Sequence, residues 1–276
     1  MPSDPRILFQ GERIRVEKLE HGVIRLVLAR PELRNAFDVA MITELTQVLS
    51  DLALWPPSDL RVLLLVGDGE VFCAGADLDY MRALAAHSMD ENLADAHRLG
   101  AMFRLLAAFP APVLCGIQGA AIGGGFGLAA CADVVVAEES VVFALPEVRL
   151  GILPAVISPF VVRKLGLAQA GPLMLSGRRL GSMEAKTLGL VHEIVPPESS
   201  LEAALAAQLA ELLQAGPEAA WRTKALLQRE APLPDPELAE YTARAIAETR
   251  STDEAHAGIG AFFAKTPAPW TPPAEL

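Results

Sequence analysis

The sequence predicts an α/β fold in which most of the strands are parallel. Three apolar segments, 62–66, 113–117 and 134–137, contain no charged side chain, as expected of strands that are covered on both faces. Segments with apolar residues at helical spacing separate them, and this alternation is typical of parallel strands connected by helices. Two of the predicted strands lead into turns of small residues, and each turn is followed by a predicted helix.

The first elements along the chain are a predicted hairpin and a helix. The strands of the hairpin are Ile14–Lys18 and Val23–Leu28, joined by a short turn that contains glycine. Asp38 can cap a helix at residues 38–53, and Trp55 with the two prolines after it ends that helix. The apolar residues of this helix recur at helical spacing, at Met41, Leu45, Val48, Leu49 and Leu52.

The alternation continues through the middle of the chain and then stops. Residues 78–110 are predicted to form two helices that are separated near Ser88, and a short strand is expected at 141–145. Beyond about Val195 only helical patterns follow. These segments are expected as helices at 201–213, 217–228 and 235–251, followed by an irregular, proline-rich tail at 266–273. The asymmetry predicts an α/β core at 1–195 and a helical region at 196–276.

The composition limits the class of protein. Hydrophobic residues make up 52% of the chain, but every apolar run is interrupted before the ~18 residues that a membrane span needs. The net charge of −11 disfavours binding to nucleic acids or anionic membranes. Cys73, Cys115 and Cys131 lack the spacing of a metal site or a disulfide framework. They are predicted to be buried in the protein, which is expected in a reducing compartment. Residues 1–6 lack the order of a secretory signal, so a cytoplasmic location is expected.

Residues 122–127, with the sequence Ile-Gly-Gly-Gly-Phe-Gly, form the most informative segment. Adjacent glycines expose backbone N–H groups to a ligand, and the helix that begins here adds unsatisfied amides and the positive end of its dipole. Residues 72–78 repeat the arrangement after the strand at 62–66. Two such turns predict that one oxygen atom, which carries or develops negative charge, is bound from two sides.

A dinucleotide site is the alternative interpretation of a glycine cluster between a strand and a helix. The order Gly-Gly-Gly-Phe-Gly differs from the G-x-G-x-x-G of such sites, and no acidic residue ends a strand about 20 positions further on. Glu138 and Glu139 come close to that distance, but they lie in a polar turn. The cluster therefore favours an oxygen-binding turn.

Seven segments together resemble the enoyl-CoA hydratase/isomerase (crotonase) superfamily. In chain order they lie at 30–36, 72–77, 119–127, 132–133, 143–151, 185–191 and 262–265. The resemblance implies a spiral of ββα repeats with C-terminal helices that pack between the subunits of a trimer or a hexamer. It also implies an acyl-CoA thioester as the substrate, with coenzyme A as part of it and no separate cofactor. By motif matching, the backbone amides of Ala74 and Gly124 bind the thioester oxygen.

The resemblance assigns the acid–base chemistry to Glu147. Hydratases of this family that use two carboxylates have one glutamate at the position of Gly127 and a second at the position of Glu147, and this chain keeps only the second. A single glutamate can take a proton from water and return it to C2 if both lie on the same face of the substrate. The same equipment also serves double-bond isomerisation or decarboxylation, so one glutamate does not distinguish these reactions.

The segment 150–162 points to a branch of the family. Most members have a run of glycines here, whereas this chain has Pro-Ala-Val-Ile-Ser-Pro-Phe at 154–160. That version resembles the hydratases of 3-methylglutaconyl-CoA and isohexenylglutaconyl-CoA in leucine and acyclic-terpene breakdown. Both substrates carry a second carboxylate, which a cation would bind, and Arg82 and Arg149 are the candidates.

The resemblance also implies contacts with coenzyme A. Backbone groups of Arg34, Asn35 and Ala36 would contact the adenine. Lys265, from a neighbouring subunit, would approach the phosphates, and Lys224 is a weaker candidate for the same role.

Residues near the second turn complete the predicted site. Asp77 is expected to cap the following helix or to orient the turn, and Tyr80, Met81 and Leu84 are candidates for the wall of the acyl pocket. The other predicted substrate contacts are Cys73, Ala76, Asp77, Leu78, Met81 and Gly123. The five histidines show no ligand spacing, so no metal site is predicted.

The predicted function is therefore that of an enoyl-CoA hydratase for a glutaconyl-type ester. The alternatives are an enoyl-CoA isomerase or acyl-CoA decarboxylase on the same scaffold, and a CoA-binding subunit without turnover. The helix at 201–213 is apolar over most of its circumference and must be covered on more than one side. We therefore expect a homo-oligomer, a trimer or a hexamer, without a nucleic-acid or membrane partner.

Overall fold

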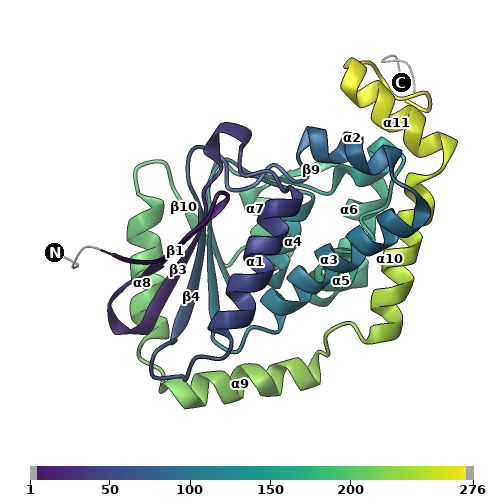
Figure 1. Ribbon diagram of the computed structural model, residues 1–276. Coiled ribbons are helices and arrows are strands. Elements are labelled where there is room, and N and C mark those ends of the chain that lie inside the picture. Colours follow the sequence, from purple (N-terminus) through teal and green to yellow (C-terminus); the bar gives the residue numbers. More distant parts are fainter. Residues whose placement is uncertain (1–4, 272–276) are drawn as a thin grey trace.

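The computed structural model describes residues 5–271, and a seven-stranded sheet lies at their centre (Figure 1). In spatial order its strands are β1 (Arg6–Gln10), β2 (Ile14–Lys18), β3 (Val23–Leu28), β4 (Val62–Gly67), β5 (Val113–Ile117), β7 (Val134–Glu138) and β10 (Glu193–Val195). The pairs β1–β2 and β2–β3 are antiparallel, and the other four pairs are parallel. The predicted α/β fold with a mainly parallel sheet is confirmed.

A smaller sheet carries the glycine turn. Its strands are β6 (Ala120–Ile122), β8 (Val142–Ala144) and β9 (Arg179–Gly181), with β8 in the middle. β6 and β8 are parallel, and Ile122 is paired with Ala144. The chain therefore leaves both strands at the same edge, which makes the glycine turn a neighbour of the segment after β8. The two segments lie some twenty residues apart in the sequence.

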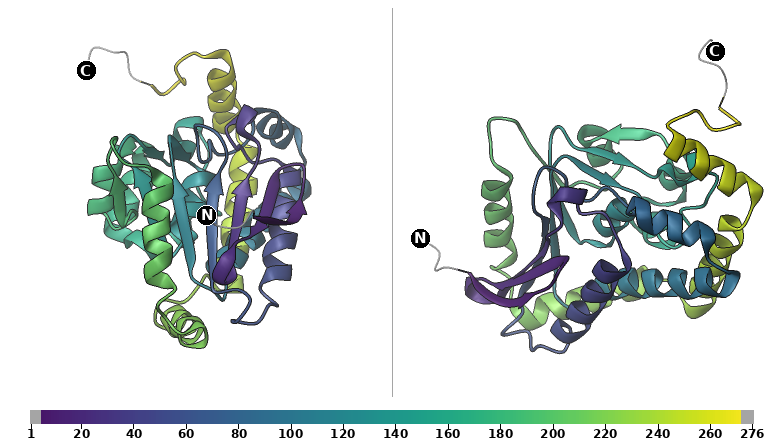
Figure 2. Two further views of the ribbon diagram at one scale, coloured as in Figure 1. Left: turned by 90° about the vertical axis from the view of Figure 1, so that its left-hand side faces the viewer. Right: turned by 45° about the horizontal axis from the view of Figure 1, so that its top comes forward.

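Helices cover both faces of the large sheet. They are α1 (Val39–Leu52), α2 (Leu78–Ala86), α3 (Met89–Ala107), α4 (Gly124–Cys131), α5 (Ser158–Leu165), α6 (Leu167–Ser176), α7 (Ser182–Thr187), α8 (Leu201–Leu212), α9 (Pro217–Glu230), α10 (Pro236–Arg250) and α11 (Asp253–Ala264). Figures 1 and 2 show α8 on one face of the sheet and α1 and α4 on the other. Alternate residues of each strand serve the two faces. Leu64 of β4 packs beneath α8 with Leu205, whereas Leu63 and Leu65 belong to the core on the opposite side.

Helix boundaries follow the caps that the sequence contains. The Asp38 carboxylate accepts the N–H of Met41 at 2.8 Å and begins α1. Ser88 separates α2 from α3 and forms a capping box with Glu91. The predicted hairpin, the two helices after residue 78 and the burial of all three cysteines are confirmed.

The C-terminal helices pack around the core at several places. α8 contacts β5 and β7, α10 lies along α3, and α11 contacts the 3-10 helix η3 (Pro146–Leu150). Within a single chain α8 is covered on one side only, because Leu205 is buried while Ala203, Ala206 and Ala207 are exposed.

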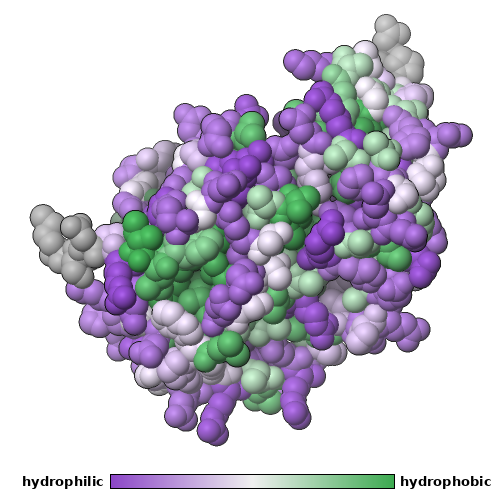
Figure 3. Space-filling view, viewed as in Figure 1, coloured by the Kyte–Doolittle hydropathy of each residue, from purple (hydrophilic) through white to green (hydrophobic). Residues whose placement is uncertain are grey.

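The surface near the C-terminus is rich in apolar side chains. Figure 3 shows apolar side chains gathered around α11 at the upper right, and Phe262 of this helix is 46% exposed. A subunit interface would cover such surface, but the trimer or hexamer and the division at residue 195 stay predictions. Residues 266–271 form neither helix nor strand, and residues 272 and 273 of the predicted tail, like residues 1–4 at the start, lie outside the described residues. Among residues 5–271, no helix has the length and apolar character needed to cross a membrane.

Candidate active site

The two glycine-containing turns and the segment after β8 meet at one cavity of about 990 Å³. The first turn opens α4, the second opens α2, and Glu147 lies on η3. The turns touch each other, because a Cβ atom added to Gly75 would lie 3.0 Å from the carbonyl oxygen of Ile122. The structure therefore brings together the three segments that the sequence singled out.

The first turn requires glycine at Gly123 and Gly124. Gly123 has φ +52° and ψ −112°, a conformation that residues with a side chain rarely adopt. A Cβ on Gly124 would lie 2.6 Å from the ring of Phe37. Gly124 is the first residue of α4, so its amide has no partner in the helix, and it donates no hydrogen bond within residues 5–271. This N–H and the helix dipole are available to a ligand in the cavity.

On the second turn the available amide is that of Ala76 and not that of Ala74. Ala76 is paired with Phe37 in an isolated parallel bridge, and the residues on either side of Ala76 exchange hydrogen bonds with Phe37 at 2.7 and 2.8 Å. In such a bridge the Ala76 N–H points away from Phe37, and it has no acceptor in the described chain. The Ala74 N–H donates to the carbonyl oxygen of Arg34 at 3.0 Å. The prediction for Ala74 is corrected, because its donor is already used.

Asn35 holds the second turn in place. Its side chain is fully buried: Oδ1 accepts the N–H of Arg30 at 2.8 Å, and Nδ2 donates to the carbonyl oxygens of Asp68 and Val71 at 2.9 and 2.8 Å. These bonds tie the loop before α1 to the chain that leads into the turn. Asn35 does not line the cavity, so its side chain has a positioning role, and the predicted contact of its backbone with the adenine stays a prediction.

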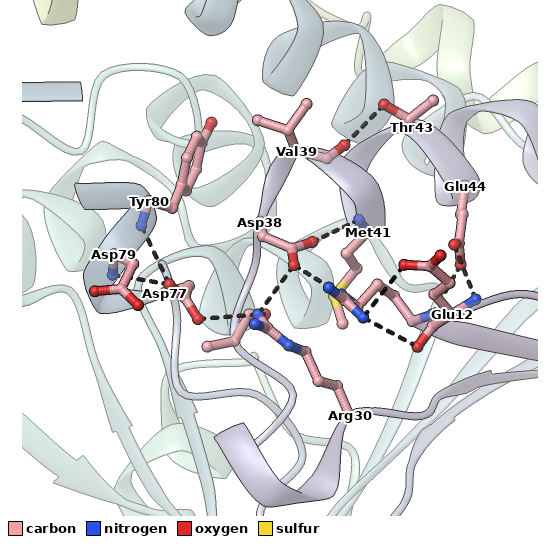
Figure 4. Close-up of polar contacts among 12 residues, drawn as sticks. Glu12, Arg30, Asp38, Val39, Met41, Thr43, Glu44, Asp77, Asp79 and Tyr80 are labelled. Carbon is pink, nitrogen blue, oxygen red and sulfur yellow. Dashed lines mark hydrogen bonds and ion pairs between the residues drawn. The ribbon is translucent and has the colours of Figure 1, made fainter. Parts of the chain in front are cut away.

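An ion-pair network fixes the start of α2 (Figure 4). Nη1 of Arg30 lies 3.0 Å from Oδ2 of Asp77 and 3.2 Å from Oδ2 of Asp38. The other oxygen of Asp77 caps α2 by accepting the N–H groups of Asp79 and Tyr80 at 2.8 and 3.1 Å. Both oxygens of Asp77 are used in orienting the turn and the helix, in line with its predicted capping role.

Glu147 presents a carboxyl oxygen without a partner beside the glycine turn. Oε1 lies close to Gly123, where an added Cβ would be 3.1 Å away. Oε2 is buried and has no hydrogen-bond partner among the described residues. Burial raises the pKa of Glu147 to about 7, although its own backbone N–H opposes this. A carboxyl group with such a pKa can both take and give a proton near neutral pH.

The position of the missing second carboxylate is closed by packing. A Cβ added to Gly127 would lie 2.8 Å from Cγ2 of Ile157 and 2.9 Å from Cε1 of Phe103. Phe103 is fully buried, and Ile157 nearly so. The site is therefore built around one carboxyl group, and apolar side chains fill the place where a second one would begin.

Apolar side chains form the walls of the cavity beyond the turns. Tyr80, Met81 and Leu84 of α2 line it, and so do residues 154–157 of the segment that resembles the glutaconyl branch. Of the predicted site residues, those that line the cavity are Arg34, Ala36, Ala74, Ala76, Asp77, Leu78, Met81, Gly123, Gly124 and Glu147. The walls thus come from several elements that are distant in the sequence.

Besides Asn35, three predicted contacts lie away from the cavity. Lys224 on α9 is buried, and its Nζ donates to the Asp133 carboxylate at 2.6 Å and to the Ala111 carbonyl at 2.9 Å, so the suggestion that it binds phosphate is corrected to an internal ion pair. Cys73 is fully buried, which raises the pKa of its thiol to about 12, and it does not line the cavity. Lys265 follows α11 and is exposed, away from the cavity of its own chain; its predicted role in a neighbouring subunit stays a prediction.

Five arginines line the cavity, and the sequence indicated only some of them. The exposed ones are Arg34, Arg82, Arg149 and Arg179. The fifth, Arg250, ends α10, and only 11% of its side chain is exposed. No local pattern marks it in the sequence, because its place depends on the packing of α10 against α3.

Comparison with known proteins places these observations in a family. The sequence profile of the family described as enoyl-CoA hydratase/isomerase matches residues 18–273. The 2,3-dehydroadipyl-CoA hydratase of Escherichia coli is 32% identical over 248 residues, 89% of this chain and 94% of that protein. An enoyl-CoA hydratase structure from Shewanella pealeana has a TM-score of 0.76 and 37% identity, covering 95% of this chain and 97% of that one. The structure of Pseudomonas aeruginosa AtuE has a TM-score of 0.75 and 38% identity, covering 94% and 99%.

Proposed function

Because the chain belongs to the enoyl-CoA hydratase/isomerase family, we propose that it adds water across the 2,3 double bond of a glutaconyl-type CoA ester with Glu147 as its one acid–base residue. The family match and the similar solved hydratases confirm the predicted superfamily, fold class and kind of enzyme. The observation that carries the proposed mechanism is the buried Oε2 of Glu147, which has no hydrogen-bond partner in the described part of the chain, while packing closes the position of a second carboxylate at Gly127.

The proposed reaction uses Glu147 twice. The ionised carboxylate takes a proton from water as the water oxygen forms a bond to C3, and the electron pair of the double bond moves through C2 to the thioester oxygen. The enolate then collapses while protonated Glu147 gives its proton to C2. The net change is the addition of one water molecule, and the carboxylate returns to its starting state. A pKa near 7 suits both steps, because neither direction of proton transfer is strongly uphill at neutral pH.

The thioester oxygen is the atom on which negative charge develops. Ala76 and Gly124 line the same cavity, and their N–H groups have no acceptor among residues 5–271. We assign these N–H groups as the two donors to the thioester oxygen. Amides held by a strand bridge and by a helix N-terminus need no reorganisation during the reaction, and removing one such donor typically costs about 3–4 kcal/mol of transition-state stabilisation.

Two observations support a glutaconyl-type acyl group. Residues 154–157, in the segment that resembles this branch, line the cavity. The relative from Escherichia coli is named for 2,3-dehydroadipyl-CoA, whose acyl group, like a glutaconyl group, ends in a carboxylate. The cytoplasmic location and a role of the enzyme in leucine or terpene breakdown stay predictions from the sequence.

A panel of CoA esters tests the proposal. Purified protein is incubated with glutaconyl-, 3-methylglutaconyl-, dehydroadipyl- and crotonyl-CoA, and the products are identified by mass spectrometry. We expect a gain of one water molecule on the dicarboxylic esters. A product of unchanged mass with a shifted double bond would identify an isomerase, loss of CO₂ would identify a decarboxylase, and no reaction with any ester would contradict turnover.

A further inference from the structure

The side chain of Arg250 lines the cavity, and most of its N–H donors have no acceptor among residues 5–271. It is the last residue of α10, it lines the cavity, and its side chain is only 11% exposed. Nη1 lies 3.2 Å from Oδ2 of Asp95 and 3.3 Å from Oδ1 of Asn92. Nε and Nη2 donate no hydrogen bond to any residue in the range 5–271. Such donors, held away from bulk water, are suited to bind an anionic ligand.

The charges around Arg250 leave one positive charge unbalanced. Asp95 is fully buried and is the carboxylate paired with Arg250. The same carboxylate also pairs with Arg98 at 3.3 Å and accepts the hydroxyl hydrogen of Tyr80. Burial, together with the neighbouring Asp95 charge, raises the pKa of Tyr80, so the phenol stays neutral. Two guanidinium groups thus share one carboxylate, and a second carboxylate would complete the pairing.

Apolar residues of three helices line the same cavity as Arg250. Ile246 lies one turn earlier on α10, Ile259 comes from α11, and Leu99 comes from α3; all three line the cavity. An acyl chain fits such a lining, and a charge at the end of that chain requires a partner there. Hydrogen bonds between ionised groups in poorly solvated surroundings are about twice as strong as neutral ones.

The other arginines of the cavity are poorer candidates for this role. Arg82 pairs with Asp79 and lies 4.3 Å from the centroid of the Phe263 ring, while Arg149 donates to the carbonyl oxygen of Ser176. Arg82 and Arg149, like Arg34 and Arg179, are exposed, so a carboxylate beside any of them would stay hydrated and gain little.

We propose that Arg250 binds the terminal carboxylate of the acyl group and so makes the site selective for CoA esters of dicarboxylic acids. This inference rests on the proposed function for its substrate class, and it assigns the cation that Arg82 or Arg149 was expected to supply. The carboxylate receives the Nε and Nη2 donors in a bidentate pair, while Nη1 stays with Asp95. Arg250 is then the specificity-determining residue of the site.

Binding of unreactive esters tests this proposal separately from turnover. Glutaryl-CoA and 5-methylhexanoyl-CoA match in chain length and in branching at the end of the acyl group, but only the first is charged there. Dissociation constants from isothermal titration calorimetry are compared for the full-length protein, Arg250→Met, and Arg98→Met as the matched control. Arg98 contacts the same carboxylate but does not line the cavity.

We expect Arg250→Met to weaken glutaryl-CoA binding at least ~10²-fold and to change 5-methylhexanoyl-CoA binding less than ~3-fold. Arg98→Met removes a half-exposed charge that does not line the cavity, so it should weaken glutaryl-CoA binding by at most ~10-fold and leave 5-methylhexanoyl-CoA binding within ~3-fold. Equal loss for both esters in Arg250→Met, or equal affinity of the unaltered protein for both, would overturn the proposal and leave Arg250 as a link between α3 and α10.

A second variant covers the case in which Arg250→Met does not fold. Arg250→Lys keeps the charge and the pairing with Asp95 but loses the bidentate fork, and it should still weaken glutaryl-CoA binding at least ~10-fold while sparing the neutral ester. Failure of the proposed function has a different signature, namely tight binding of glutaryl-CoA through Arg250 without hydration of glutaconyl-CoA.

Discussion

Replacing Glu147 by glutamine removes the proposed acid–base group while keeping its size. The buried Oε2 becomes an amide nitrogen or oxygen in the same place, so the fold and the binding of CoA esters should persist. Turnover should fall at least ~10²-fold, because general acid–base catalysis contributes about 10²–10⁴-fold. The logarithm of kcat/KM of the unaltered enzyme should decline below the raised pKa of about 7, because protonated Glu147 cannot take a proton from water. The residual activity of the variant should not show this decline at low pH.

The same substitution has a predictable effect on stability. Burial raises the carboxyl pKa from 4.5 to about 7 in the folded protein. Because the folded-state pKa lies above the unfolded value, the contribution of Glu147 to stability is complete below pH 4.5 and is lost as the pH rises through about 7. The difference corresponds to about 3 kcal/mol. Glu147→Gln carries no charge, so at pH 8 it should be more stable than the unaltered protein by roughly this amount, and near pH 4 it should not.

Two measurements check this prediction together. Hydration of a glutaconyl-type ester is followed across pH 5–9, and urea unfolding of both proteins is measured at pH 8 and at the lowest pH at which both stay folded. Normal turnover by Glu147→Gln would refute the single-carboxylate mechanism. Equal stability of the two proteins at pH 8 would show that the carboxyl group is not desolvated as described.

Two further substitutions test the packing around the site. Gly127→Glu, which restores the second carboxylate of related enzymes, should not raise turnover. It should lower the free energy of unfolding by about 1–3 kcal/mol or more, since its Cβ meets Ile157 and Phe103. Urea unfolding checks this against the control Gly171→Glu, at a position with open space around it, and a faster enzyme of normal stability would contradict the prediction. Asn35→Ala removes the partners of one buried and two partly buried backbone groups, and it should lose at least about 2 kcal/mol of stability together with turnover. Gln118→Ala, whose two bonds are partly buried and exposed, should lose less. Equal losses for these last two variants would remove the special role of Asn35.

The sequence predicted those parts of the fold and site that rest on local patterns. The buried strands were visible as apolar runs. The turn at 122–127 was visible because three adjacent glycines indicate a backbone without side chains. Glu147 was found by its motif position. The missed β1 is short and mostly exposed, so it carries no periodic signal, and α11 combines glycine with exposed phenylalanine and lacks a clear apolar stripe.

The parts that failed depend on contacts between distant segments. Which amide of the second turn is free is decided by Phe37, some forty residues earlier, because its bridge turns the Ala76 N–H towards the cavity. In the sequence Lys224 resembles any lysine on a helix surface, because its partner Asp133 is 91 residues away and meets it only through the packing of α9. Arg250 reaches the cavity because α10 packs along α3, which brings it to Asp95 across 155 residues. No local pattern contains such information.

A crystal structure of the protein with an unreactive CoA thioester tests the central claim most directly. The account predicts that the thioester oxygen lies about 2.7–3.2 Å from both the Ala76 and the Gly124 nitrogen atoms, with Oε2 of Glu147 facing the C2–C3 bond. A thioester oxygen bound elsewhere, or held by the Ala74 amide after its bond to Arg34 has broken, would contradict the assignment of these donors and the mechanism built on them.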